Sequence, residues 1–449
     1  MRKLFGTDGI RGVAGKYPLD DATVYAIGLA LAHSLARQTP QPRVVLGMDT
    51  RESSSGLAAT LAHGLQDGGA SVASAGVLPT PGVAYIARTR GFAAGVVLSA
   101  SHNPWQDNGI KVFGGNGYKL PDAIELGIEQ EIFDKLAMTH PPRAATAAVP
   151  VPDPSLRRAY IDFLASQTPE LQLQGRTLVV DFANGAASAI APELLARFGG
   201  TVVLTHASPD GRNINEQCGA LHPEIVAAEV TARGADAGVT FDGDADRALF
   251  ADEHGKVVNG DAVLLIAARD LLARGTLRQN TVVATSMSNM GLEAALRRDG
   301  ITMLRAAVGD KYVLEEMQRT GAVLGGEQSG HILFLDRNTT GDGLLTALVV
   351  LDMMVRSGKT LSQLTSDLKV FPQTIINVKV REKRPIEELP AVVSVIQEAE
   401  SELDGNGRVV IRYSGTEALA RVMIEAESEE AMRRHAHRIA DAIRAELGA

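Results

Sequence analysis

Residues 236–247, Asp-Ala-Gly-Val-Thr-Phe-Asp-Gly-Asp-Ala-Asp-Arg, place a short apolar run directly before three alternating aspartates. A short apolar run such as Asp236–Phe241 is typical of a strand that is buried on both faces of a parallel sheet. The polar loop Asp242–Arg247 then lies at the carboxyl end of this strand, where open α/β sheets bind their ligands. The stretch therefore predicts an α/β sheet with a ligand-binding loop at its edge.

The same arrangement occurs twice more. The strand-like run Ala93–Leu98 leads into the loop Ser99–Pro104, and Ala322–Leu324 leads into Gly325–His331. Each of these strands is the third in a unit of strand, helix, strand, helix and strand. The first strands are Val44–Met48, Leu178–Phe182 and Thr281–Thr285, and the second strands are Ala70–Ala75, Thr201–Thr205 and Ile301–Ala306. Strands that alternate with helices predict three similar doubly wound α/β domains.

The pattern changes near Phe371-Pro372, after which a strand, a helix, two strands and a final helix follow. This order indicates a smaller α+β domain. The segment Pro141–Pro154 is rich in Pro and Ala and is typical of a linker. We therefore expect domains at residues 1–150, 151–255, 256–370 and 371–449, three of them mixed α/β and the last α+β.

The bulk properties exclude several classes of function. A chain of 449 residues is too long for one hydrophobic core, which stops growing near ~250–300 residues. The net charge of −9 and the absence of a basic block argue against a nucleic-acid partner. No apolar stretch approaches the ~20 residues of a membrane-spanning helix, and no signal peptide is expected. The single cysteine, Cys218, fits a cytoplasmic protein.

The loop with Asp242, Asp244 and Asp246 indicates a cation site, because three crowded carboxylates repel one another unless a cation joins them. Hard oxygen ligands suit magnesium or calcium. An EF-hand loop is excluded because Arg247 stands where that loop requires glycine. The adjacent arginine favours a magnesium ion that meets a phosphoryl group, and a purely structural cation site is the alternative.

Ser101 is the candidate nucleophile of the Ser99–Pro104 loop. A serine on such a rim can attack if a base or a cation assists it, and His102 is adjacent. Pro104 biases the preceding residue away from helical conformations, so the loop is extended or turned. Neither a hydrolase triad order nor a nucleophile elbow is present, and a simple polar turn is the alternative.

The third loop offers a carboxylate, a hydroxyl and an imidazole at alternate positions, Glu327, Ser329 and His331. If this segment is extended, the three side chains share one face and can bind the vicinal hydroxyls of a sugar. A solvated sheet edge is the alternative.

A fourth loop, in the last domain, has the composition of a phosphate site. Arginine matches phosphate oxygens in a bidentate manner, and glycine lets backbone N–H groups approach. The candidate groups are Arg412, Ser414, Gly415, Thr416 and Arg421. A charged surface turn is the alternative. No Walker motif is present, so a nucleoside triphosphate is not expected.

The opening Phe5–Gly12 and the four polar loops, taken in order, resemble the five signatures of the α-D-phosphohexomutase superfamily. The resemblance covers nearly the whole chain. It implies four domains around a central cleft and a required phosphoserine at position 101. It also implies one Mg²⁺ per chain, sugar contacts and a phosphate-binding loop. The residues concerned are Asp242, Asp244, Asp246 and phosphorylated Ser101 for the metal, Glu327 and Ser329 for the sugar, and Ser414–Thr416 for the phosphate.

The implied reaction passes a phosphoryl group from Ser101 to a hexose monophosphate and takes the other phosphate back from the resulting bisphosphate. Arg247, Lys111 and Arg11 are expected to offset charge on the moving group. His102, Lys111 and His331 are candidate proton carriers, which the sequence does not rank.

Two stretches, Phe-Gly-Thr-Asp-Gly-Ile-Arg-Gly and Gly-Gly-Glu-Gln-Ser-Gly-His, resemble the superfamily branch that acts on glucosamine phosphates. This implies interconversion of glucosamine 6-phosphate and glucosamine 1-phosphate through a 1,6-bisphosphate, for bacterial UDP-N-acetylglucosamine and cell-wall precursor synthesis. A phosphomannomutase or phosphoglucomutase with the same mechanism is the main alternative, and a binding-only regulator or a phosphatase are others. Ala418 stands where the superfamily often has proline. The expected partner is a small hexosamine phosphate, and a homodimer is compatible with the sequence.

Overall fold

The computed structural model describes residues 4–138, 151–414 and 418–448. The chain divides into two compact units, one formed by residues 1–286 and 304–366 and the other by residues 287–303 and 367–449. Among the described residues, no helix combines the length and the apolar character that a membrane crossing requires.

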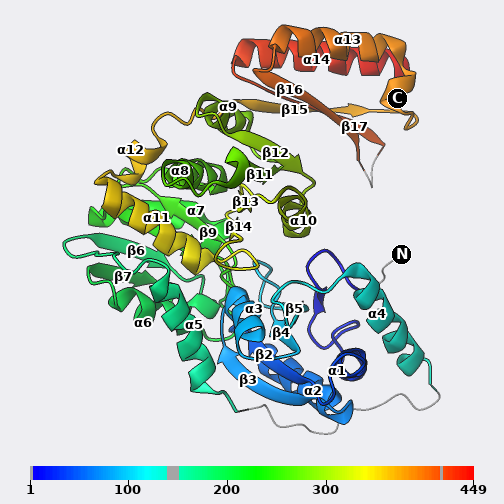
Figure 1. Ribbon diagram of the computed structural model, residues 1–449. Coiled ribbons are helices and arrows are strands. Elements are labelled where there is room, and N and C mark those ends of the chain that lie inside the picture. Colours follow the sequence, from blue (N-terminus) through cyan, green and yellow to red (C-terminus); the bar gives the residue numbers. More distant parts are fainter. Residues whose placement is uncertain (1–3, 139–150, 415–417, 449) are drawn as a thin grey trace. The chain divides into compact units, whose positions relative to one another are not determined.

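The first sheet of the larger unit has the order β1-β5-β4-β2-β3. β2, β3 and β4 run parallel, whereas β5 and β1 are antiparallel. Its elements, drawn in blue to cyan in Figure 1, are β1 (Ile10–Val13), α1 (Asp21–Ala36), β2 (Arg43–Met48), α2 (Ser54–Asp67), β3 (Ser71–Val77), α3 (Thr80–Thr89), β4 (Ala94–Leu98), β5 (Asp107–Gly114) and α4 (Asp122–Leu136).

The core of this domain lies between one sheet face and the helices α1, α2 and α4. Two glycines let α1 and α2 approach closely. A Cβ atom at Gly28 would lie 2.4 Å from the Leu61 carbonyl oxygen, and one at Gly64 would lie 2.2 Å from that of Tyr25. Such distances are far inside van der Waals contact, so any side chain at either position would push the two helices apart.

The second sheet has the order β10-β9-β8-β6-β7, with β7, β6 and β8 parallel and β9 and β10 antiparallel. Its elements are α5 (Pro154–Ser166), β6 (Thr177–Asp181), the 3₁₀ turn η1 (Ala186–Ala189), α6 (Ala191–Ala196), β7 (Thr201–Thr205), η2 (Gly219–Leu221), α7 (Pro223–Arg233), β8 (Ala237–Phe241), β9 (Ala248–Ala251) and β10 (Val257–Val258).

The third sheet has the order β12-β11-β13-β14. The segments of this part of the chain are α8 (Gly260–Ala273), η3 (Arg278–Asn280), β11 (Thr281–Thr285), α9 (Met290–Arg298), β12 (Thr302–Ala306), α10 (Asp310–Thr320), β13 (Leu324–Gly326), β14 (Ile332–Phe334), α11 (Gly343–Ser357) and α12 (Leu361–Thr365). β13 runs parallel to β11, and β14 runs antiparallel to β13.

The three sheets share one topology, which confirms the predicted repeat. In each, the first strand of the repeat lies between the second and the third, and an antiparallel strand follows the third. The matching runs are β3-β2-β4-β5, β7-β6-β8-β9 and β12-β11-β13-β14. The loops that begin after β4, β8 and β13 therefore occupy equivalent places, at the carboxyl ends of the third strands.

The smaller unit has an antiparallel sheet of order β15-β17-β16. Its elements are β15 (Gln373–Lys379), η4 (Ile386–Glu388), α13 (Pro390–Leu403), β16 (Gly407–Tyr413), β17 (Leu419–Ala426) and α14 (Glu429–Leu447), joined by α9 from earlier in the chain. Glu425 on β17 connects these parts: it is buried, ion-pairs with Arg408 at 2.7 Å, and accepts a hydrogen bond from the Met290 amide at 2.9 Å.

A buried carboxylate caps α11 in the larger unit. Asp342 Oδ1 accepts a hydrogen bond from the Leu345 amide at 3.0 Å, and Oδ2 accepts from the Tyr160 hydroxyl at 2.9 Å and the Asn338 amide at 3.0 Å. Burial nevertheless raises the pKa of Asp342 to about 6. The folded protein thus keeps this carboxyl protonated up to a higher pH than the unfolded chain does.

The raised pKa of Asp342 predicts that stability falls as pH rises. The unfolded pKa is near 3.8, so the folded state binds more protons between about pH 4 and pH 6, and stability falls as pH rises through that window. Relative to Asp342→Asn, which cannot ionise, the wild-type protein should lose up to ~3 kcal/mol of unfolding free energy across this window. Urea unfolding of both proteins at several pH values measures this difference, and parallel pH curves would contradict the prediction.

Candidate active site

Ser101 follows β4 in a tight turn and is 2% exposed. Its Oγ atom donates a hydrogen bond to Asp242 Oδ2 at 2.5 Å and lies 3.3 Å from His102 Nδ1. The loop that carries the serine and the loop that carries the aspartates therefore meet, although they are far apart in the sequence. The hydroxyl lies where both a base and a cation could assist it.

Asp242, Asp244 and Asp246 follow β8 and are buried, and ligand oxygens of the three lie within 4.8 Å of one another. Burial, together with the charges of Asp246 and Asp244, raises the pKa of Asp242 well above its usual value. Asp244 Oδ1 and Asp246 Oδ1 are buried without a hydrogen-bond partner within the described part of the chain. Crowded hard oxygens with unsatisfied lone pairs fit a bound divalent cation such as Mg²⁺.

Lys111, on β5, is 2% exposed and lies among carboxylates. Its Nζ atom is 2.7 Å from Asp244, 2.9 Å from Asp8 and 3.3 Å from Asp246. Burial acts to lower the pKa of Lys111, but these carboxylates outweigh it and hold the pKa well above its usual value. Lys111 therefore supplies a fixed positive charge beside the candidate metal ligands.

The third loop is a turn and not the extended segment considered from the sequence. The Gly330 amide donates to the Glu327 carbonyl at 3.0 Å, so Glu327, Ser329 and His331 do not share one strand face. Ser329 Oγ instead donates to Glu327 Oε2 at 3.2 Å. The glycines on both sides of Glu327-Gln328-Ser329 let this segment turn, which the alternation of polar residues alone did not reveal.

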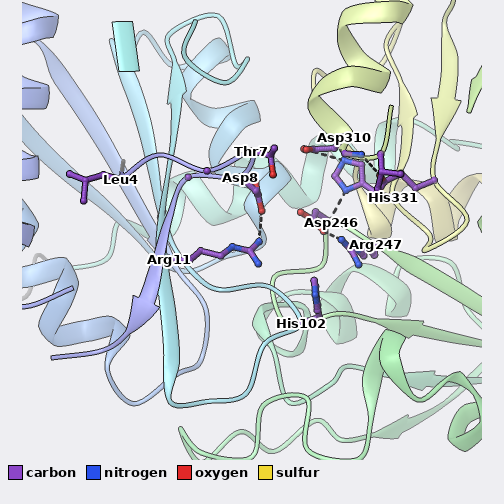
Figure 2. Close-up of a pocket in the computed structure, with 14 residues that line it drawn as sticks. Leu4, Thr7, Asp8, Arg11, His102, Asp246, Arg247, Asp310 and His331 are labelled. Carbon is purple, nitrogen blue, oxygen red and sulfur yellow. Dashed lines mark hydrogen bonds and ion pairs between the residues drawn. The ribbon is translucent and has the colours of Figure 1, made fainter. Parts of the chain in front are cut away.

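His331 links the third loop to the aspartate loop. Its Nδ1 atom lies 3.6 Å from Asp246 and its Nε2 atom 3.8 Å from Asp310, and Figure 2 shows the ring between these two carboxylates. Burial acts to lower the pKa of His331, but Asp246 and then Asp310 raise it to about 9.

These loops border one pocket of about 450 Å³ in the larger unit (Figure 2). It is lined by Leu4, Gly6, Thr7, Asp8, Gly9, Arg11, His102, Asp246, Arg247, Val308, Gly309, Asp310, Glu327 and His331. The lining combines cationic groups with carboxylates and backbone groups, which suits a ligand that carries both phosphate and hydroxyl groups.

Comparison with known proteins finds matches along nearly the whole chain. Four domain families match it in order: "Phosphoglucomutase/phosphomannomutase, alpha/beta/alpha domain I" over residues 2–138, domain II over 158–255, domain III over 259–371 and the C-terminal domain over 375–442. Proteins named phosphoglucosamine mutase from Koribacter versatilis and Solibacter usitatus are 60% and 52% identical to it, over 100% of this chain and 98% and 99% of theirs.

The chain belongs to the phosphoglucosamine mutase family, within the α-D-phosphohexomutase superfamily. It is therefore an enzyme of the phosphohexomutase class. A solved structure of a phosphoglucomutase/phosphomannomutase family protein from Burkholderia thailandensis has the same fold, with a TM-score of 0.78, 25% identity, and coverage of 99% of this chain and 98% of that one.

The sequence analysis did not assign a role to three charged residues at or beside this pocket, Asp8, Lys119 and Asp310. Lys119 Nζ lies 2.8 Å from Asp8 and 2.5 Å from Asp310, so it joins the opening segment to the start of α10. Burial acts to raise the pKa of Asp8, but Lys111, Lys119 and Arg11 hold it well below its usual value. The sequence could have indicated Asp310 as a site residue, because it follows the carboxyl end of β12, and α/β sheets bind ligands at that end of their strands.

The fourth loop belongs to the smaller unit, where only part of it is described. Gly415 and Thr416 lie outside the described residues, whereas Ser414 is buried at the end of β16. Arg412 and Arg421 are exposed and pair directly across β16 and β17.

Proposed function

We propose that this enzyme interconverts glucosamine 6-phosphate and glucosamine 1-phosphate with Ser101 as the phosphoryl carrier. The observation that carries the proposal is the buried hydrogen bond from Ser101 Oγ to Asp242, one of three clustered carboxylates beside the pocket. A nucleophile placed on a candidate metal site is not needed for sugar-phosphate binding alone. The glucosamine substrate follows from the full-length relatives, which are named phosphoglucosamine mutase at up to 60% identity.

The proposed reaction has two transfers. In the first, the bond between phosphorus and Ser101 Oγ breaks, a bond to the free hydroxyl oxygen of the sugar monophosphate forms, and the proton of that hydroxyl passes to Ser101 Oγ. In the second, the other phosphate of the 1,6-bisphosphate returns to Ser101 Oγ, and the oxygen it leaves takes a proton. The proton carriers are drawn from His102, Lys111 and His331, all of which are at or beside the pocket.

Asp242, Asp244, Asp246 and the phosphate on Ser101 would hold one Mg²⁺. When bound, the ion would supply charge neutralisation for the phosphoryl oxygens. Lys111, Arg11 and Arg247 add positive charge from the chain itself. Arg11 pairs with Asp8 at 2.5 Å, and Arg247 lines the pocket beside Asp246.

The substrate contacts are part of the same proposal. Glu327, Ser329 and His331 would bind the sugar hydroxyl or amino groups, since Glu327 and His331 line the pocket and Ser329 donates a hydrogen bond to Glu327. The fourth loop would bind a phosphate group. Its proposed ligands are Arg412, Ser414, Gly415, Thr416 and Arg421.

The proposal also covers the domain bounds, the cellular location, the oligomeric state and the use of the product. The four domains would end near residues 150, 255, 370 and 449. The enzyme would work in the cytoplasm as a homodimer. Its product, an amino-sugar 1-phosphate, has the chemistry that a nucleotidyltransferase would use for UDP-N-acetylglucosamine and cell-wall precursors.

Substrate preference tests the proposal. We expect the specificity constant for glucosamine 1-phosphate to exceed those for glucose 1-phosphate and mannose 1-phosphate by roughly 10- to 200-fold, the range that one altered contact typically gives. All three sugars are assayed with Mg²⁺ for isomerised product and for released phosphate. Equal or better use of glucose or mannose phosphate would favour a phosphoglucomutase or phosphomannomutase, and stoichiometric phosphate release would indicate a phosphatase.

A further inference from the structure

Ser101 has a backbone φ of 53°, in the left-handed region that L side chains other than Asn and Asp rarely adopt. A serine stays in this conformation only when its surroundings hold it there. Such strain clusters at functional sites, where it fixes the direction of a reacting side chain. The groups that hold the carbonyl oxygens of the Ser101 turn therefore matter for the reaction.

One of these groups is the guanidinium of Arg51, which follows β2 and is completely buried. Its Nη2 atom donates hydrogen bonds to the carbonyls of Ser101 at 2.8 Å and Asn103 at 2.9 Å, and Nη1 donates to that of Pro104 at 3.1 Å. Its Nε atom lies 2.9 Å from the buried carboxylate of Asp49. The planar fork of arginine thus holds three carbonyl oxygens of one turn.

The other group is the side-chain amide of Asn215, in the segment between β7 and η2. Its Nδ2 atom donates to the same carbonyls, at 2.9 Å to Ser101 and 3.1 Å to Asn103. Asn215 belongs to the part of the chain that also carries Asp242, to which Ser101 Oγ donates its hydrogen bond. The neighbouring domain therefore contacts both the backbone and the hydroxyl of Ser101, and Arg51 adds contacts to the backbone from the domain of Ser101 itself.

The amide side of the turn is fixed by the same network. The Ser101 N–H donates to Ser99 Oγ at 2.9 Å, and Ser99 Oγ donates to Asp49 Oδ2 at 2.6 Å. Asp49 is the partner of Arg51, so the contacts form a closed loop around the serine. Arg51, Asn215, Asp49 and Ser99 do not line the pocket, and they share Ser101 as a hydrogen-bond partner or reach it through one another.

We propose that Arg51 and Asn215 are positioning residues that keep Ser101 in its strained conformation and its oxygen aimed at the aspartate cluster. The inference rests on the proposed role of Ser101 as phosphoryl carrier. A phosphoryl group adds a charge of about −1.5 to −2 and three acceptor oxygens to the Ser101 side chain, and the two side chains hold the turn in place as these new contacts form. A misplacement of ~1 Å in a reacting group can cost ~100-fold in rate.

The test measures one half-reaction. Unphosphorylated enzyme with Mg²⁺ is mixed with glucose 1,6-bisphosphate, and intact-mass spectrometry follows the gain of one phosphoryl group on Ser101. In this step a sugar oxygen–phosphorus bond breaks, the Ser101 Oγ–phosphorus bond forms, and the Oγ proton passes to the released sugar hydroxyl. Steady-state kcat and KM for glucosamine 1-phosphate are measured in parallel.

The variants distinguish the effect of losing the Asn215 side-chain amide from the effect of changing the backbone conformation there. Asn215 has φ 58°, so Asn215→Gly removes the amide and permits the same backbone. The matched control is Gln217→Gly, in the same segment at φ 49° with an exposed side chain. Asn215→Asp keeps the shape but turns a carboxylate toward two carbonyl oxygens. Arg51→Lys keeps a positive charge beside Asp49 but loses the fork.

We expect Asn215→Gly and Arg51→Lys to lower both the phosphorylation rate and kcat by about 10- to 100-fold with KM nearly unchanged, and Asn215→Asp to lower them further. Gln217→Gly should resemble the wild type, and the thermal midpoints of Asn215→Gly and Gln217→Gly should agree closely. Normal rates in Asn215→Gly, an equal loss in Gln217→Gly, or a loss confined to KM would overturn the inference. If wild-type enzyme itself takes no phosphoryl group onto Ser101, the proposed function fails, and the positioning role fails with it.

Discussion

Ser101→Ala is expected to lose at least ~1000-fold in mutase activity, because it removes the oxygen that is proposed to carry the phosphoryl group between the two transfers. Alanine retains the backbone and removes only the Oγ atom that contacts Asp242. The fold should therefore persist, as judged by circular dichroism and thermal unfolding. Activity is measured in both directions with Mg²⁺ and a bisphosphate activator present.

The matched control for Ser101→Ala is Ser166→Ala, which removes an exposed hydroxyl at the end of α5 and should keep full activity. Near-normal turnover of Ser101→Ala would disprove the carrier role. A phosphopeptide from the wild-type enzyme that maps to Ser99 would move the role to that residue, which here supports the Ser101 amide.

Asp244→Asn is expected to lower activity by about 100-fold or more and to raise the Mg²⁺ concentration needed for half-maximal rate. The change removes one of three clustered carboxylates while keeping an oxygen for the hydrogen bonds from Thr80 and Lys111. A bound cation contributes several kcal/mol of charge stabilisation in such reactions, so a weakened site has a large kinetic effect. The measurement is a Mg²⁺ titration of chelator-treated enzyme.

The matched control for this change is Asp252→Asn. Asp252 is also a buried aspartate of the second sheet domain, but it holds the β9–β10 turn through the amides of His254 and Lys256. Its substitution should leave the Mg²⁺ titration unchanged. Full activity of chelated wild-type enzyme, or a wild-type titration curve for Asp244→Asn, would refute the metal role.

The sequence was sufficient to predict the repeated sheets because local patterns determine them. Apolar runs, glycine breaks and polar loops identified β4, β8 and β13, and the loops after them face a common pocket. Contacts made by residues with no distinctive neighbours were not predictable. Lys119 follows no motif, and its bridge between Asp8 and Asp310 exists only because two domains pack together.

The error at Glu327–His331 has a local cause. Alternating polar residues are typical of a strand, but the glycines at positions 326 and 330 and the hydrogen bond from the Gly330 amide to the Glu327 carbonyl favour a turn. Arg51 and Asn215 were not predicted for a different reason, because no local sequence pattern marks them. Each resembles an ordinary polar loop residue, and their shared target, the Ser101 carbonyl, is visible only in three dimensions.

The smaller unit is discontinuous in the chain, and this has a consequence for its synthesis. Proteins emerge from the ribosome from the N-terminus, and domains tend to fold as they appear. The α9 segment emerges long before β17, yet the Met290 amide at its start donates a hydrogen bond to the buried Glu425 on β17. Nascent chains stopped after residue 371 would therefore expose the start of α9 to solvent, and proteolysis there should cease once β17 has been translated.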